Sequence, residues 1–258
     1  MKRYTIVTRP DDLSQSLSKK LHTVLEEHNH ILDEENPEIV FVIGGDGTFI
    51  YAVHQYLEKL SSLCFYGIHT GTLGFYTDYK DSDLEEFINT YLEGNLTEVT
   101  YPLLEVNTSK DTYYALNEMR IENVVRTQEM NISINQTLFE TYRGTGMCVS
   151  TQLGSTAYNR SLGGAVLQEG LHLIEMCEIA GIHHSQYKSL GSPIVMNATC
   201  KLCFESDDYH GAILGIDSDV YPLDEETKVY VKTSSTKYVR MLRGKEVSYF
   251  SRLQSLFL

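Results

Sequence analysis

The amino-acid sequence predicts two domains, an α/β domain built on a parallel sheet and a β-rich domain that follows it. Up to about residue 97, short apolar runs alternate with segments of helical periodicity, an order typical of strands joined by helices. Beyond that point apolar and polar residues alternate in short runs, as in strands with one buried face. The 258 residues suffice for two modest domains. We place the boundary near residues 97–101 and expect right-handed crossovers in the first domain.

The first domain is organised around a glycine turn. Five apolar residues, Ile39–Ile43, run into Gly44-Gly-Asp-Gly-Thr48, and such a run predicts a strand buried on both faces. Residues at helical spacing follow and predict a helix: Ile50, Val53, Leu57 and Leu60. Backbone amides at a helix N-terminus favour anions, so we expect a phosphate site in this turn. The residues expected to bind phosphate or ATP are Gly44, Gly45, Gly47 and Thr48.

Asp46 places a carboxylate inside this turn. A carboxylate would repel phosphate unless it binds a metal ion or takes a proton. The alternative interpretation is a tight turn in which the aspartate only caps the helix.

Further strands and helices are expected on both sides of the turn. Residues 4–8 and 63–68 read as strands. Asp12 or Ser14 should cap a helix with an apolar stripe of Leu13, Leu17, Leu21, Val24 and Leu25. Ser82 and Glu85 should form a capping box for a helix that ends at Gly94.

A second glycine loop, residues 69–76, follows the strand at 63–68. Loops at the carboxyl ends of parallel strands line the ligand crevice of an α/β sheet, so this loop should lie near the first. Phe75 and Tyr76 would stack there on a base, or else pack against the sheet edge.

The second half predicts a hairpin and three polar insertions. Residues 131–135 and 137–141 read as paired strands, and further strands are expected at 201–206, 212–217 and 228–233. The insertions are Asn117-Glu118, the hydroxyl-rich segment 150–161 and Asp217-Ser-Asp219. Each alone is typical of an ordinary turn or cap. Together, their amides, acids and hydroxyls suit ribose hydroxyls and base edges.

The composition of the chain indicates which binding partners and which cellular compartment to expect. A net charge of −14 argues against nucleic-acid or anionic-membrane binding, which require basic surface. We find neither a signal sequence nor an apolar run long enough to span a membrane, and expect a cytoplasmic protein. Cys200 and Cys203 have redox or zinc spacing, but in a strand they would point to opposite faces. Adjacent His183 and His184 converge poorly on one ion and are expected at a surface or interface.

Several motifs, in order along the chain, resemble those of bacterial NAD kinases of the shorter Firmicute type. They are Gly44-Gly-Asp-Gly47, His69-Thr-Gly-x-Leu-Gly-Phe-Tyr76, Tyr101-Pro-Leu-Leu104, Ala115-Leu-Asn-Glu118, Ser150-Thr-x-x-Gly-Ser-Thr-Ala-Tyr-Asn159, Gly163-Gly164-Ala165, Gly191-Ser-Pro-Ile-Val195 and Ile216-Asp217. The first motif is shared with phosphofructokinases and lipid kinases. The Asn-Glu and Gly-Ser-Thr-Ala-Tyr motifs make the resemblance specific.

The resemblance implies a Rossmann-like α/β domain of the GGDG kinase type and a β-sandwich-like domain that binds NAD. It implies domain limits of 1–98, joined by the tail 241–258, and 99–240. It further implies transfer of phosphate from ATP to the 2′-hydroxyl on the adenosine ribose of NAD, giving NADP, with a divalent cation such as Mg²⁺. Members of the family are usually homodimers or homotetramers.

Residue roles follow from the same resemblance. Asp46 matches the family's proton acceptor, and Gly47 would lie beside NAD. Asn117 and Glu118 would hold ribose hydroxyls. The residues that would line the base and ribose pockets are Thr156, Ala157, Tyr158 and Ser161. Further positions that would contact the dinucleotide are Phe75, Tyr76, Arg143, Thr145, Ala180 and Asp217.

The chain departs from the family pattern at four places. Thr145 stands where a carboxylate is common, and Gln152 stands where a proline is common. Ser218 stands where a histidine is common in close relatives, and the aromatic and basic tail is thinned to Ser248-Tyr-Phe-Ser-Arg-Leu253, without Trp. Two rival hypotheses therefore stay open at this point: another GGDG kinase acting on a lipid or sugar phosphate, and an NAD(P)-binding sensor without catalysis. The phosphoryl donor (ATP or polyphosphate) and the acceptance of NADH also stay open.

Overall fold

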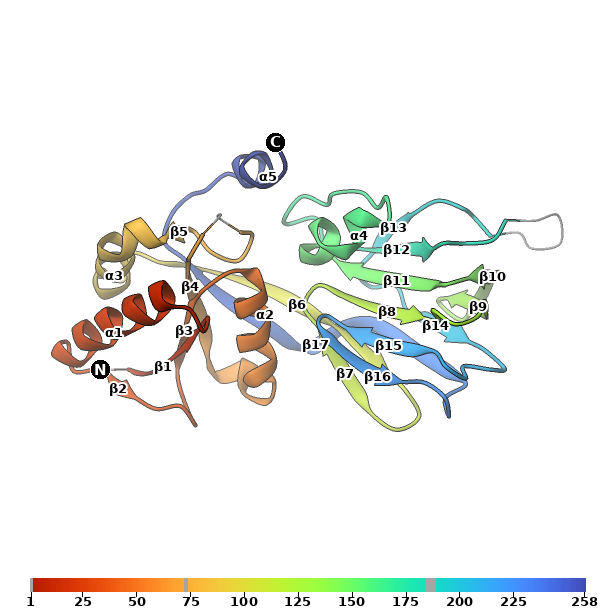
Figure 1. The fold of residues 1–258 in the computed structure, drawn as a ribbon, viewed down its shortest axis with the longest axis horizontal. Helices are drawn as coiled ribbons and strands as arrows, with labels where there is room; N and C mark the ends of the chain where they lie inside the picture. The colour runs from red at the N-terminus through yellow and green to blue at the C-terminus, as the bar shows by residue number, and fades with distance from the viewer. Residues whose placement is uncertain (1, 72–73, 184–188) are drawn as a thin grey trace. The chain divides into compact units, whose positions relative to one another are not determined.

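The structure, a computed structural model, describes residues 2–71, 74–183 and 189–258 (Figure 1). The chain forms two compact units. The first holds the residues up to Tyr101 together with Lys237–Leu258, and the second holds Pro102–Thr236. Strands β6 (Thr97–Asn107) and β17 (Lys228–Arg243) contribute residues to both units. The domain limits expected at 98/99 and 240/241 stay a prediction.

The first unit is an α/β unit. Besides parts of β6 and β17 it contains β1 (Arg3–Thr8), α1 (Asp12–Glu27), β2 (Ile31–Leu32), β3 (Ile39–Ile43), α2 (Asp46–Gln55), the 3₁₀ helix η1 (Leu57–Ser62), β4 (Cys64–His69), β5 (Tyr79–Lys80), the 3₁₀ helix η2 (Asp81–Asp83), α3 (Leu84–Glu93) and α5 (Tyr249–Phe257). Among the described residues, no helix has both the length and the apolar character that a membrane-spanning segment needs.

Strands β2, β1, β3 and β4 of this unit pair in that order and are all parallel. Successive side chains of a strand point to opposite faces of the sheet. Phe41 of β3 therefore lies in the cluster that α1 and α3 cover, whereas Phe49 of α2 contacts Phe65 of β4 at a ring distance of 5.5 Å. Figure 1 shows α1 and α3 on one side of these strands and α2 on the other. The predicted parallel α/β arrangement is confirmed.

The cap of α1 lies one residue earlier than the sequence suggested. Asp11 accepts hydrogen bonds from the backbone N–H of Ser14 at 3.0 Å and from its hydroxyl at 2.8 Å. The assignment of the cap to Asp12 or Ser14 was therefore wrong. Leu13, expected in the apolar stripe, is 47% exposed, because Ser14 takes the buried position of the first turn and bonds Thr70 there.

Two other local predictions are corrected. The capping box of Ser82 and Glu85 does not form, because the chain enters α3 through η2 and the Asp83 carboxylate accepts the Lys80 N–H at 3.3 Å. Gly94 ends α3 in the left-handed conformation, as predicted. The helix after the glycine turn is shorter than expected. It ends at Gln55, and Leu57 and Leu60 belong to η1, since a 3₁₀ helix also repeats every three residues.

The second unit is rich in strands. Besides parts of β6 and β17 it contains β7 (Thr112–Ala115), β8 (Glu118–Glu122), β9 (Gln128–Ile134), β10 (Thr137–Gly144), β11 (Gly146–Thr151), the 3₁₀ helix η3 (Leu153–Thr156), α4 (Tyr158–Ser161), β12 (Leu173–Ile179), β13 (Ile194–Asn197), β14 (Leu202–Glu205), β15 (Ile213–Ile216) and β16 (Asp219–Pro222).

Two sheets in this unit enclose one core. The first sheet has the order β13-β12-β11-β8-β15-β16, and in the second β10-β9-β14-β17 continues through β6 to β7. Inward residues of both sheets, such as Ile121 of β8 and Phe204 of β14, belong to the same buried cluster. Asn135 and Gln136 join β9 to β10 with φ of 50° and 69°, as in a two-residue hairpin. The β-sandwich-like fold and the predicted hairpin are confirmed.

Candidate active site

In the first unit, the glycine turn opens directly into α2. Gly45 precedes the helix, and its carbonyl accepts the Thr48 and Phe49 N–H groups at 3.0 and 3.1 Å. Gly44 packs so closely that a Cβ there would lie 2.4 Å from Thr48 Oγ1. A Cβ on Gly47 would meet nothing within 4 Å. The turn thus combines close packing on one side with open space beside the first helical turn, as a phosphate site requires.

The Asp46 carboxylate is held by the second glycine loop. Its oxygens accept the backbone N–H groups of Phe75 at 3.0 Å and of Tyr76 at 3.3 Å. Gly74 passes so close that a Cβ would lie 2.1 Å from Asp46 Oδ1. The two loops therefore meet as predicted, and the loop amides fix the direction of the carboxylate. Thr72 and Leu73 of the same motif lie outside the described residues.

His69 is a buried residue whose role the sequence did not reveal. Its Nδ1 accepts the Gly74 N–H at 3.2 Å and lies 3.3 Å from the Thr77 hydroxyl. An Nδ1 that accepts a hydrogen bond leaves the ring proton on Nε2. Burial lowers the pKa of His69, and the charge of Asp46 opposes that shift only in part. A neutral imidazole thus supports the loop. A histidine directly before a glycine loop was the available signal.

The two aromatic residues of the loop pack within their own unit. Tyr76 stacks on Phe49 with ring centroids 5.0 Å apart and an angle of 12°. Phe75 contacts the rings of Tyr249 and Phe257 at 6.0 and 6.2 Å. Both residues are buried, which agrees with the packing alternative. Contact of Phe75 and Tyr76 with a dinucleotide stays a prediction.

In the second unit, Asp217 folds the Asn117-Glu118 turn around its carboxylate. Oδ2 accepts the Leu116 N–H at 2.8 Å, and Oδ1 accepts those of Asn117 at 2.7 Å and Glu118 at 3.2 Å. Asp217 is buried and has the left-handed φ of 51°. Its carboxylate therefore positions the turn, a role that the resemblance, which made it a dinucleotide contact, did not suggest.

Glu118 is buried without full hydrogen bonding. Its side-chain oxygen Oε2 has no hydrogen-bond partner within the described part of the chain, and the same holds for Oγ of Ser150, which is opposite it on β11. Burial, followed by the charge of Asp217, raises the pKa of Glu118 to about 8, while Arg120 lowers it in part. A buried polar atom without a partner costs stability. The oxygen is thus available to a hydroxyl donor.

The hydroxyl-rich segment packs against this turn through Gly154. A Cβ on Gly154 would lie 2.1 Å from the Asn117 carbonyl oxygen, so only glycine permits the contact. Thr156 donates its hydroxyl to the Leu153 carbonyl at 3.2 Å, and Ala157 and Ser161 lie before and at the end of α4. The structure therefore brings the segment beside Asn117.

Tyr158 extends along β8. Its hydroxyl donates to Glu122 Oε1 at 3.0 Å, and the Arg120 guanidinium lies 4.8 Å from its ring centroid. Burial and Glu122 raise the pKa of Tyr158. Tyr158 thus contacts Arg120 and Glu122, which lie two and four residues after Glu118 on the same face of β8.

Three predicted residues form a separate group. The Arg143 carbonyl accepts the Ile182 N–H at 2.7 Å, and the Thr145 N–H donates to the Ile179 carbonyl at 3.0 Å, next to Ala180 with φ of 48°. Thr145 precedes the end of β11 that pairs with Glu122, whereas Ser150 pairs with Glu118. Arg143, Thr145 and Ala180 therefore lie near the other end of the paired strands β8 and β11.

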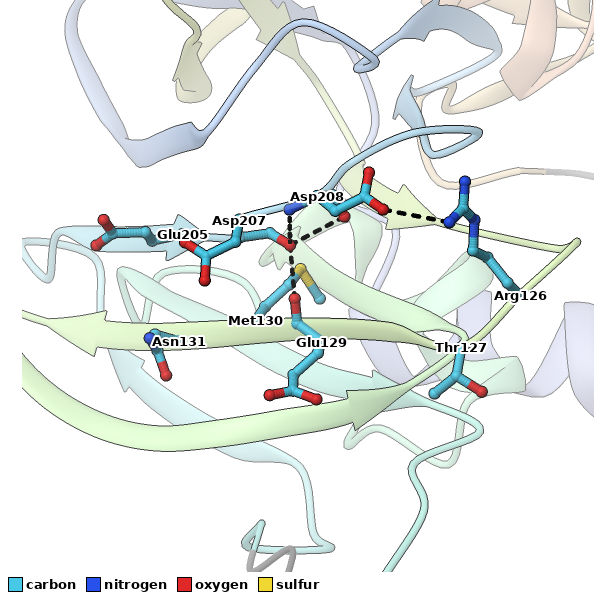
Figure 2. A pocket seen from close by; sticks show the side chains of 9 residues that line it. Arg126, Thr127, Glu129, Met130, Asn131, Glu205, Asp207 and Asp208 are labelled. Carbon is cyan, nitrogen blue, oxygen red and sulfur yellow. Dashed lines mark hydrogen bonds and ion pairs between the residues drawn. The ribbon is translucent and has the colours of Figure 1, made fainter.

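A hollow of about 250 Å³ in this unit contains none of the predicted site residues (Figure 2). Four of its nine lining residues are acidic, and Arg126 pairs there with Asp208 at 3.2 Å. Within the described ranges, no group of three or more His, Cys, Asp or Glu residues is arranged to hold a metal ion. His183 lies on the surface, 3.5 Å from a Glu178 oxygen, and His184 is outside the described residues.

Comparison with known proteins shows to which family this chain belongs. Residues 116–243 match the family model described as the ATP-NAD kinase C-terminal domain. The NAD kinase of Limosilactobacillus reuteri is 38% identical over 229 residues, covering 87% of this chain and 85% of that protein. The chain belongs to the NAD kinase family. NAD kinase 1 of Bacillus anthracis is 34% identical over 269 residues, covering 99% and 98% of the two chains.

Solved structures agree with this assignment at the level of fold. A yeast NADH kinase complexed with NADH has a TM-score of 0.83 at 16% identity and covers 99% of this chain and 87% of its own. An Archaeoglobus fulgidus NAD kinase in complex with ATP has a TM-score of 0.82 at 20% identity, covering 98% and 99%. The family resemblance drawn from the sequence motifs is confirmed.

Proposed function

We propose that this member of the NAD kinase family phosphorylates the 2′-hydroxyl on the adenosine ribose of NAD, with ATP as donor, and so forms NADP. The observation that carries the proposal is Glu118, a buried carboxyl group with an unpartnered oxygen beside Asn117. A carboxyl group and a side-chain amide on adjacent residues suit the two neighbouring hydroxyls of a ribose. Asp217 holds their backbone in place through its three amide contacts.

Asp46 is the residue that we assign to the chemical step. Phosphoryl transfer passes through a loose transition state, so positioning and charge neutralisation matter more than the strength of a base. The loop amides of Phe75 and Tyr76 aim the carboxylate, which in the proposal orients the attacking hydroxyl and takes its proton. The glycine turn, with Gly44, Gly45, Gly47 and Thr48, binds the phosphates of the donor through backbone amides.

A divalent cation fits this arrangement as an ion held mainly by nucleotide phosphates. Mg²⁺ usually keeps few protein ligands, commonly one or two carboxylates together with phosphate oxygens. Asp46 is the carboxylate of the glycine turn and is only partly buried. When bound, such a cation would neutralise charge on the transferred phosphoryl group.

The other contacts belong to the same proposal. Thr156, Ala157, Tyr158 and Ser161 would line the base and ribose pockets. Further residues that would contact the dinucleotide are Phe75, Tyr76, Arg143, Thr145, Ala180 and Asp217. We also propose a cytoplasmic homodimer or homotetramer, and light scattering of the purified protein would measure the assembly.

The function is tested by assaying purified protein with NAD, ATP and Mg²⁺ through an NADP-specific dehydrogenase. NADP formation that depends on ATP is the expected result. Calorimetry on the same sample separates the outcomes. Tight binding of NAD without NADP formation would identify a sensor, and absence of both would overturn the proposed substrate. Polyphosphate in place of ATP, and NADH in place of NAD, define the range of donor and acceptor.

A further inference from the structure

The peptide groups of residues 74–78 are held from two sides. Their amides at Phe75 and Tyr76 donate to the Asp46 carboxylate. Their carbonyl groups accept from arginines of the C-terminal segment. Arg252 donates to the carbonyls of Gly74, at 3.3 Å, and Thr77, and Arg243 donates to the carbonyl of Phe75 at 3.2 Å. The same short segment thus connects Asp46 to residues near the end of the chain.

Asp78 completes this connection. Its Oδ1 accepts from both guanidinium groups, at 2.9 Å from Arg243 Nη1 and also from Arg252 Nη2, and its Oδ2 accepts the Gly244 N–H at 3.2 Å. The side chains of Asp78, Arg252 and Arg243 are 1%, 4% and 10% exposed. Buried charges require pairing and full hydrogen bonding. Because both guanidinium groups share the single Asp78 carboxylate, the loop carbonyls accept hydrogen bonds from their remaining N–H groups.

Helix α5 presents Arg252 in an unusual way. Arg252 is the buried residue of this helix, whereas neighbouring Leu253 and Leu256 are only partly buried. A surface helix normally buries its apolar side chains and exposes its charges. Tyr249 and Phe257, at the two ends of α5, contact the ring of Phe75. The helix is therefore arranged around the loop that directs Asp46.

We propose that Arg252 is a positioning residue for catalysis, which acts through the peptide groups of 74–77 on the direction of the Asp46 carboxylate. This inference rests on the proposed function. Arg252 touches neither substrate nor reacting atoms in this proposal. Its planar guanidinium bridges two carbonyls and Asp78 at once, a geometry that a lysine ammonium does not reproduce.

The test compares Arg252→Lys with Gln254→Ala, a change of an exposed residue on the same helix. Misplacement of a catalytic group by about 1 Å can cost about 100-fold in rate. We expect Arg252→Lys to lower kcat by about 10- to 100-fold and to keep KM for NAD within about twofold. Gln254→Ala should keep both constants. A wild-type kcat in Arg252→Lys would overturn the inference.

A double-mutant cycle separates positioning from general damage to the fold. In the background of Asp46→Asn, the change Arg252→Lys should lower the residual kcat by less than about twofold, since its effect passes through the carboxylate that is already gone. An equal loss in both backgrounds would overturn the inference. If Arg252→Lys fails to fold, Arg243→Lys, which alters the contact to Phe75, enters the same cycle with the same criteria. A wild-type enzyme that forms no NADP would instead refute the proposed function.

Discussion

Asp46 and Glu118, the two acidic residues at the predicted binding turns, differ in burial and in hydrogen bonding. Asp46 is partly exposed, and both of its oxygens accept backbone amides of the neighbouring loop. Glu118 is buried, and one of its oxygens has no hydrogen-bond partner among the described residues. A carboxylate that is aimed by its own chain suits a chemical step. A carboxylate that lacks donors suits the binding of a ligand that brings them.

The largest effect is expected at Asp46. Asp46→Asn preserves size but removes the charge and the proton acceptor. One of the two backbone amides of Phe75 and Tyr76 still finds an oxygen, and the other faces the new NH₂ group at this partly exposed site. General base catalysis and its orientation contribute about 10²- to 10⁴-fold, so we expect a loss of kcat in that range with normal folding. Steady-state kinetics and a melting curve check it. A mutant that retains nearly full kcat would remove Asp46 from the chemistry.

A smaller effect, on KM for NAD and not on kcat, is expected at Glu118. Glu118→Gln keeps the shape but replaces a charged acceptor by a neutral one. Hydrogen bonds to charged groups contribute about 1.5–3 kcal/mol, and an amide retains part of this, so KM for NAD should rise about tenfold at about pH 8.5. kcat should change little. An unchanged KM would show that the unpartnered oxygen does not face the ribose.

Asp217 should act on both binding and stability, because it forms the turn that carries Asn117 and Glu118. Asp217→Asn turns one acceptor oxygen into a donor that opposes a backbone N–H. We expect the free energy of unfolding to fall by about 1–3 kcal/mol and KM for NAD to rise. Urea titration and kinetics measure the two effects. Asp207→Asn, a change at an exposed aspartate between β14 and β15, is the control and should leave stability within about 0.5 kcal/mol.

The protonation of Glu118 predicts a pH dependence of stability. Its pKa is raised to about 8 by burial, against an ordinary value of about 4.3 in an unfolded chain. Between these values the folded state binds a proton that the unfolded state has released. This contribution to stability is complete below the unfolded pKa and is lost as the pH rises through the folded pKa.

Urea unfolding between about pH 5 and pH 9 measures this loss. Relative to Glu118→Gln, the wild type should lose on the order of 4 kcal/mol over that interval. Glu85→Gln, a change at an exposed glutamate of α3, serves as control. Parallel curves for the wild type and Glu118→Gln would contradict the raised pKa.

The smallest effect is expected at the cap of α1, where Asp11 bonds Ser14 and not a residue of either turn of the comparison. Asp11→Ala removes the acceptor of the Ser14 amide and hydroxyl and should lower the melting temperature by about 2–4 °C without changing kcat. Asp12→Ala is the matched control, since the neighbouring aspartate accepts no capping bond in the structure as described. An equal change in both variants would place the cap elsewhere.

The sequence predicted the elements whose signals are local. The apolar run before Gly44 and the turn at Asn135-Gln136 specify a strand and a hairpin within a few residues. The cap of α1 was missed by one residue, because Asp11, Asp12 and Ser14 are all good caps and only the backbone geometry chooses among them. The same holds for Ser82, which a 3₁₀ turn displaced from the start of α3.

Long-range pairings could not be predicted in this way. The contact of Arg252 with Asp78 joins residues 174 positions apart, and that of Asp217 with Asn117 joins residues 100 positions apart. A sequence motif identifies an aspartate at a site but not whether its carboxylate faces a ligand or its own backbone. For Asp217 the structure shows the backbone role, and for Glu118 it shows an oxygen without a partner among the described residues.

The most direct measurement is the pair of constants kcat and KM for NAD, determined side by side for wild type, Asp46→Asn and Glu118→Gln. The contrast between the two carboxylates predicts that Asp46→Asn loses kcat and keeps KM, while Glu118→Gln raises KM and keeps kcat. If both variants lost kcat and KM in the same proportion, the two carboxylates would share one role, and the division between chemistry and binding would be contradicted.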